Sequence, residues 1–185
     1  ILQIGHTRTN LVVYRDAHVA AIRSIQWGGH DICQSLESVF KIPYIEAIKV
    51  LQTKSFVLMN PEGASRDQLA MHRAISDAAT PLIRELKMTL LDLRTSAGTE
   101  LRDIRLTGGA SQVQNLGDWL AHAIDVPTSP LEYFGSMTMT GKVAFRVPRT
   151  PELENAAATA IGLGIEGLRK SRNPAINLRK GLFAR

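Results

Sequence analysis

The sequence has little of what several classes of protein require. Its one cysteine, Cys33, cannot form an internal disulfide, and its His and Cys residues do not share the spacing of a metal site. We therefore expect a reducing compartment, no structural zinc and no bound metal. No apolar run reaches about 18 residues, so no membrane span is predicted, and no basic-then-apolar signal peptide opens the chain. What is present is a chain of 185 residues, 44% of them hydrophobic, which is long enough to bury one core.

Charge is balanced over most of the chain and unbalanced at one end. Residues 166–185 contain six basic side chains and one acid, Glu166, which together account for the whole formal net charge of +5. The basic charge of this segment has three possible explanations: binding to nucleic acid, attraction to a membrane surface, or exposure to solvent as a tail. It has one aromatic residue, Phe183, and no stacking pattern, so nucleic-acid binding ranks last.

The opening of the chain predicts a meander of strands followed by helices. The predicted strands span residues 1–4, 10–14 and 18–25. Gly28-Gly29 ends the meander, and Asp31 is the expected N-cap of a helix that continues to Phe40. A short helix then passes through Glu46 and Leu51. Because the chain starts inside a strand and without a methionine, we expect a fragment of a longer protein.

The strongest helical pattern begins at Ser65. Gln68, three residues later, completes a capping box, and apolar residues then recur with a 3.6-residue period as far as Leu93. Pro81 lies inside this run and lacks a backbone donor, so we predict a kink or a junction of two helices near residues 78–81. Gly98 is the expected end of the helix.

A compact β-α-β pattern follows the long helix. Its expected parts are a strand over 102–106, a turn over 107–111, a helix over 113–123 and a strand over 125–127. A long connection over 128–150 then leads to a final helix over 151–170 that is rich in small residues.

Two glycine-containing turns carry the functional signal. The turn from Thr107 to Ser111 ends a strand and opens a helix, which lets the backbone approach a base or a phosphate. The turn from Gly5 to Thr9 offers backbone N–H groups in a similar way. For each turn taken alone, an ordinary tight turn is the simpler explanation, because hairpins and strand-to-helix turns need glycine without any ligand.

The order of these elements resembles the second half of the actin-like, ribonuclease H-like ATPase fold. This resemblance implies an α/β subdomain with a mixed sheet and flanking helices over residues 1–170, followed by a basic segment over 171–185. The amino-acid sequence at residues 3–5, 24–32, 81–93 and 106–111 is most similar to the pilus-assembly PilM family and to its relative, the type II secretion L family, GspL.

The resemblance implies a nucleotide site made of two degenerate loops, with no catalytic residue and no metal ligand. Its residues are Gly5, Thr7, Thr9, Gly108, Gly109 and Ser111. The family's second phosphate loop usually begins with Asp, but this chain has Gln3, whose amide is neither a base nor a good ligand for a hard cation. We therefore expect no enzyme activity and no cofactor, with ATP binding by the full-length protein as the alternative.

The tail separates the two related families. The residues Ile176-Asn177-Leu178-Arg179-Lys180 are similar to a segment that precedes the membrane helix of the secretion L proteins. In the pilus system a similar segment belongs to a separate membrane protein, PilN, which docks on PilM. The covalent link favours the secretion L family, and basic residues beside a membrane helix attract anionic lipid.

We therefore expect a scaffold at the cytoplasmic face of the bacterial inner membrane. In the main interpretation it recruits the secretion ATPase to the platform of a type II secretion system. Its other expected partners are inner-membrane platform proteins, a second copy of itself and the anionic membrane surface. One alternative is a PilM-like, ATP-binding protein of a type IV pilus, and a second is the C-terminal half of a sugar- or acetate-kinase-like enzyme.

Overall fold

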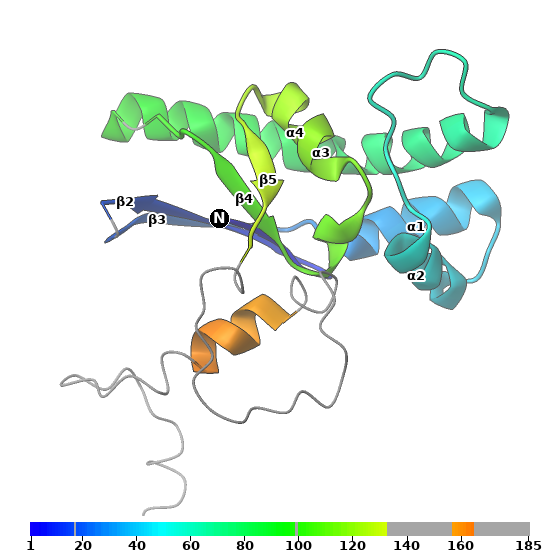
Figure 1. Ribbon diagram of the computed structural model, residues 1–185, viewed down its shortest axis with the longest axis horizontal. Helices are drawn as coiled ribbons and strands as arrows, with labels where there is room; N and C mark the ends of the chain where they lie inside the picture. Colours follow the sequence, from blue (N-terminus) through cyan, green and yellow to red (C-terminus); the bar gives the residue numbers. More distant parts are fainter. Residues whose placement is uncertain (17, 99, 133–156, 165–185) are drawn as a thin grey trace, which may run out of the picture.

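The computed structural model describes residues 1–16, 18–98, 100–132 and 157–164. They form one mixed sheet with helices on both of its faces, and a helical lobe at one end (Figure 1). In strand order the sheet is β3-β2-β1-β4-β5. The strands are β1 (Leu2–Ile4), β2 (Thr9–Arg15), β3 (His18–Ile25), β4 (Ile104–Thr107) and β5 (Thr128–Pro130).

The sheet combines an antiparallel half with a parallel half. Strands β1, β2 and β3 form the predicted meander, in which Leu2 pairs with Leu11 and Leu11 with Arg23. Strand β4 then runs parallel to β1, and β5 runs parallel to β4. As a result, the carboxyl ends of β1 and β4 lie side by side, and the turns that follow them meet at one edge of the sheet.

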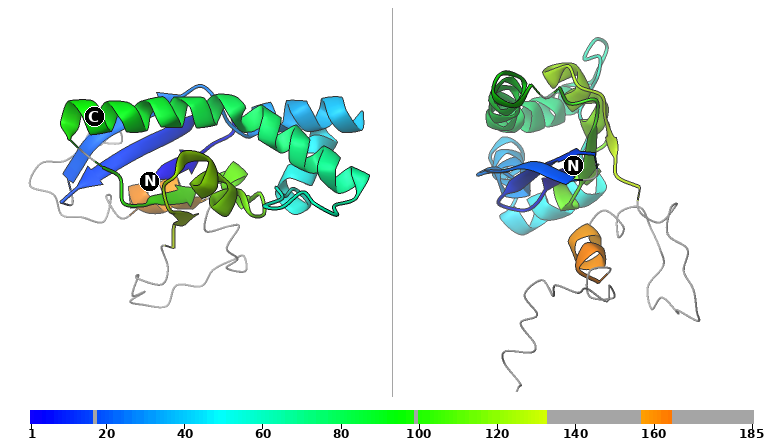
Figure 2. Two further views of the ribbon diagram at one scale, coloured as in Figure 1. Left: turned by 90° about the horizontal axis from the view of Figure 1, so that it is seen from above. Right: turned by 90° about the vertical axis from the view of Figure 1, so that its left-hand side faces the viewer.

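The helices divide into two groups. The long helix α3 (Arg66–Ala97) and α4 (Leu116–Ile124) cover one face of the sheet, and the helical segment 157–164 lies on the other, as Figures 1 and 2 show. Helices α1 (Gly29–Phe40) and α2 (Tyr44–Thr53) pack against each other, and α1 also packs on α3. Together with the first half of α3 they form the helical lobe beyond the ends of β1 and β4 (Figure 1).

The pleat of the sheet separates core from surface. Leu2 and Ile4 of β1 are completely buried, whereas Gln3 between them points to the opposite face and contacts segment 157–164. The helices contribute apolar side chains at the predicted 3.6-residue spacing, including Ile75, Leu82 and Leu86 of α3. Of the two tryptophans, Trp27 is buried and Trp119 is half-buried.

The structure confirms the predicted ends of α3. The Ser65 side chain accepts the backbone N–H of Gln68, and the Gln68 side chain accepts that of Ser65. Gly98 ends the helix in the left-handed region. The alternative of two separate helices is wrong, because α3 is continuous through Pro81; its axis changes direction near the middle (Figure 2, left).

Three other predicted boundaries are wrong. Asp31 does not cap α1: Gly28 is the N-cap, and Asp31 lies three residues inside, where its carboxylate accepts the N–H of Gly28. Helix α4, which follows a short 3-10 helix, η1 (Gly109–Gln112), begins at Leu116 instead of residue 113, because Val113 is extended (ψ 123°) and Asn115 is left-handed (φ 63°). Strand β5 begins at Thr128 instead of residue 125, since α4 continues to Ile124 and ends on a left-handed Asp125.

Several predictions concern residues outside the described part of the chain. These are most of the connection over 128–150, the two ends of the helix over 151–170, and the tail with Asn177, Leu178, Arg179 and Lys180. Within the described residues, no helix combines the length and the hydropathy of a membrane span.

Candidate functional site

The two predicted turns meet where β1 and β4 end. Gly108 follows β4 with a positive φ of 97°, and a Cβ on this residue would lie 2.2 Å from the carbonyl oxygen of Ile4. Only glycine allows this approach, because any side chain would collide with the backbone of β1. The structure therefore brings the turns together as predicted, through a contact between backbones.

The turn after β1 is held by hydrogen bonds within itself and to α1. The Gly5 N–H donates to the Arg8 carbonyl (2.9 Å), while the carbonyls of Gly5 and His6 accept the N–H groups of Gly29 (2.9 Å) and His30 (2.7 Å). Free N–H groups at a helix N-terminus are a ready site for a phosphate. Here the turn's own carbonyls occupy two of the first N–H groups of α1.

Two hydroxyl groups in these turns also have internal partners. Thr9, which is completely buried, donates its Oγ1 proton to the Trp27 carbonyl (2.9 Å), and Ser111 donates its Oγ proton to the Gly108 carbonyl (2.7 Å). Thr7 and Gly109 are exposed, and the space beside Gly109 is open. Of the six predicted residues, these two offer a ligand the most accessible surface, and nucleotide binding by the group stays a prediction.

Gln3 links the sheet to the small-residue helix. Its side-chain Nε2 donates to Thr159 Oγ1 (2.5 Å), which lies in segment 157–164 on the other face of the sheet from α3. The side chain that replaces the family's Asp is therefore engaged in holding a helix. An amide can make this contact as a donor, which a carboxylate cannot.

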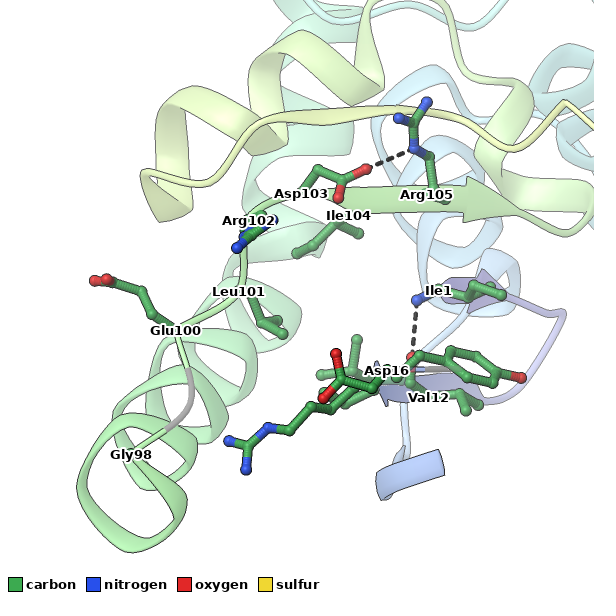
Figure 3. A pocket seen from close by; sticks show the side chains of 14 residues that line it. Ile1, Val12, Asp16, Gly98, Glu100, Leu101, Arg102, Asp103, Ile104 and Arg105 are labelled. Atoms are coloured by element: carbon green, nitrogen blue, oxygen red, sulfur yellow. Dashed lines mark hydrogen bonds and ion pairs between the residues drawn. The ribbon is translucent and has the colours of Figure 1, made fainter. Parts of the chain in front are cut away.

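A groove of about 720 Å³ opens at the other end of β1, away from the turns (Figure 3). It lies between the segment from Leu11 to Asp16 and the segment from Glu100 to Arg105. At its floor the Ile1 nitrogen donates to the Val12 carbonyl (2.8 Å).

The charges around this groove are mixed and several of them are paired. Asp103 contacts Arg105 (2.6 Å) within the lining, and Glu100 contacts Arg94 (2.9 Å). Mixed charge favours no class of ionic ligand. In the residues that the structure describes, no group of three His, Cys, Asp or Glu side chains is arranged to hold a metal.

A cluster of three rings, which the sequence did not predict, lies beside the first turn. The Tyr44 hydroxyl lies 2.6 Å from His30 Nδ1 and 3.2 Å from His6 Nε2, and all three rings contact one another. His6 comes from the turn, His30 from the start of α1 and Tyr44 from the start of α2. Their spacing in the sequence carries no signal, because the cluster exists only after the turn has docked on α1.

Comparison with known proteins gives one family match over most of the chain. The model of one protein family, described as type IV pilus assembly protein PilM, matches residues 1–168. Among curated proteins there is no significant match.

Solved structures support an actin-like fold. The chain is similar to a chain of the PilM-PilN type IV pilus biogenesis complex, with a TM-score of 0.72 and 22% identity over 91% of this chain and 46% of the other. It is also similar to Ta0583, an archaeal actin homolog (TM-score 0.55, 18% identity, 87% of this chain and 44% of the other). MreB5 of Spiroplasma citri bound to ADP is a third similar structure (TM-score 0.51, 15% identity, 70% and 47%). The chain spans less than half the length of each of these proteins, and at these identities the likeness shows the fold alone.

Proposed function

Because this chain belongs to the family of the type IV pilus assembly protein PilM, we propose that it is a component of a type IV pilus assembly machine. The observation that carries the proposal is the family match, which extends over residues 1–168 and therefore includes the sheet, both turns and all the described helices. The expectation of a type II secretion protein is replaced by the pilus alternative as the main interpretation.

The proposed partner is a membrane protein of the pilus platform. One structure with a chain similar to this one is the PilM-PilN complex. By analogy, the module binds the cytoplasmic segment of a PilN-type protein and works through protein contacts. The basic residues over 166–185 support a position at the cytoplasmic face of the membrane, since each Lys or Arg near an anionic surface contributes about 1 kcal/mol.

The proposed role does not include ATP hydrolysis. Gln3 cannot act as a base, and its amide is engaged with Thr159. Two of the first N–H groups of α1 and the hydroxyl of Thr9 are bonded within the protein. Steady-state phosphate release from ATP and Mg²⁺ tests this point: release at the rate of a blank supports it, and release that depends on protein concentration contradicts it.

A deletion strain tests the proposed pathway. Without the gene, we expect loss of surface pili and of twitching motility while protein secretion continues, and a plasmid copy should restore both. Normal piliation in the deletion strain would contradict the proposal. Loss of secretion with normal pili would support the second candidate described next.

One observation favours a second candidate, the type II secretion L protein. The residues Ile176-Asn177-Leu178 belong to the same chain as the actin-like module. In the pilus system, by contrast, a similar segment would belong to a separate PilN-type protein. In the second candidate the module recruits the secretion ATPase. The deletion strain separates the two candidates.

A further inference from the structure

We propose that His6, His30 and Tyr44 form a binding site for a divalent transition-metal ion of the Cu²⁺ and Ni²⁺ class. The donors are His6 Nε2, His30 Nδ1 and the Tyr44 phenolate oxygen. The site is independent of the proposed function, because it uses side chains that no step of that function needs.

Two nitrogen donors lie close to a third donor, the Tyr44 oxygen. Both ring nitrogens approach the same phenol oxygen, at 2.6 and 3.2 Å. Metal bonds of about 2.0–2.1 Å place two neighbouring donors at right angles roughly 2.9 Å apart. The two observed separations lie on either side of that value, so small side-chain adjustments are enough to bring an ion between the donors.

Negative charge also lies near the phenol. The carboxylates of Glu37 and Asp31 act on the Tyr44 hydroxyl, and their negative charge favours a cation at the same place. The positive end of α1 points toward the cluster, but the Asp31 carboxylate and the turn's carbonyls already occupy its first N–H groups.

The donor set selects the class of metal. Two imidazoles and one oxygen suit the tetragonal sites of Cu²⁺ and Ni²⁺, and Cu²⁺ binds most tightly in the series of divalent ions. Binding deprotonates the phenol, and the proton leaves to the solvent, so affinity should rise with pH. Water completes the coordination on the exposed side, where His6 lies.

The ion would add a covalent-like link among three segments of the chain. His6 belongs to the turn after β1, His30 to α1 and Tyr44 to α2. Metal bonds among them would fix the turn to the helical lobe. Bound metal should therefore raise the melting temperature of the protein.

The experiment is a titration of the purified, metal-free protein with Cu²⁺, followed by calorimetry and by visible absorption. We expect one site and a phenolate-to-copper charge-transfer band. His6→Ala should weaken binding by about tenfold or more, and Tyr44→Phe should remove the band. His6 is the decisive position because it is exposed in a turn, so its replacement leaves the fold intact, as metal-free melting curves will verify.

His122→Ala is the matched control, because this exposed histidine lies on α4, away from the cluster. Its affinity should stay within about twofold of the parent protein. Equal weakening by His6→Ala and His122→Ala, or a titration without the charge-transfer band, would overturn the proposal.

Discussion

The indole N–H of Trp27 donates a hydrogen bond of 2.7 Å to the backbone carbonyl of Ala78. Trp27 follows the end of β3, and Ala78 lies in α3, three residues before Pro81. Pro81 has no N–H and its ring disturbs the preceding turn of the helix, which opens the carbonyls there. The bend in α3 and the end of the meander are therefore joined by one side chain.

Trp27→Phe tests this link. The replacement removes the donor while keeping an aromatic ring, so the Ala78 carbonyl loses a buried partner. We expect the free energy of unfolding to fall by about 2 kcal/mol, measured by urea denaturation. Trp119→Phe on α4 is the control, because Trp119 is only half-buried, and an equal loss in both variants would contradict the assigned role.

Gly108 and its neighbour Gly109 form a matched pair. Gly108→Ala places a Cβ against the Ile4 carbonyl in a left-handed conformation, and we expect a loss of about 3 kcal/mol or more. Gly109→Ala enters open space and should change stability by no more than about 0.5 kcal/mol. Equal losses of stability in the two variants, by thermal or urea unfolding, would contradict this explanation. They would show that the close approach of the two turns is not the reason for glycine at position 108.

Gln3 and Thr159 should behave as one unit. Gln3→Ala and Thr159→Val each remove the hydrogen bond that fastens segment 157–164, with an expected cost of about 1 kcal/mol. Amide hydrogen exchange in 157–164 should become faster in both variants. The double variant should add little to either single one, and full additivity would show that the two side chains do not interact.

Cys33 should make the free energy of unfolding depend on pH above neutrality. Burial raises its pKa above the ordinary 9.0, so the unfolded chain loses the thiol proton before the folded one does. The stability from this group is present below that value and is lost as the pH rises through the folded pKa. Urea unfolding from pH 7 to 10.5 should show the decline, and Cys33→Ala should reduce it; an unchanged slope in that variant would assign the decline to other groups.

Much of the fold was predictable from local signals. The three strands of the meander, the capping box of Ser65 and Gln68, and Gly98 at the end of α3 all follow from patterns within a few residues. The errors have tertiary causes. Gly28 and not Asp31 is the N-cap of α1, because Gly28 is pressed against the turn after β1, where a Cβ would lie 2.4 Å from the His6 carbonyl.

The candidate site was predictable only in part. The motif order indicated that the turns at Gly5 and Gly108 belong together, and the sheet does place them side by side. The partners of Gln3, Thr9 and Tyr44 were not predictable, because each bond joins residues at least 14 positions apart in the sequence. Such contacts depend on how helices, strands and turns pack against one another in the folded protein.

The most direct test of the pilus assignment is the binding of this protein to the cytoplasmic segment of the PilN-type membrane protein encoded in the same genome. Biolayer interferometry with the purified protein should give saturable binding that is the same with and without ATP. Absence of binding to that segment, together with saturable binding to the type II secretion ATPase, would contradict the account.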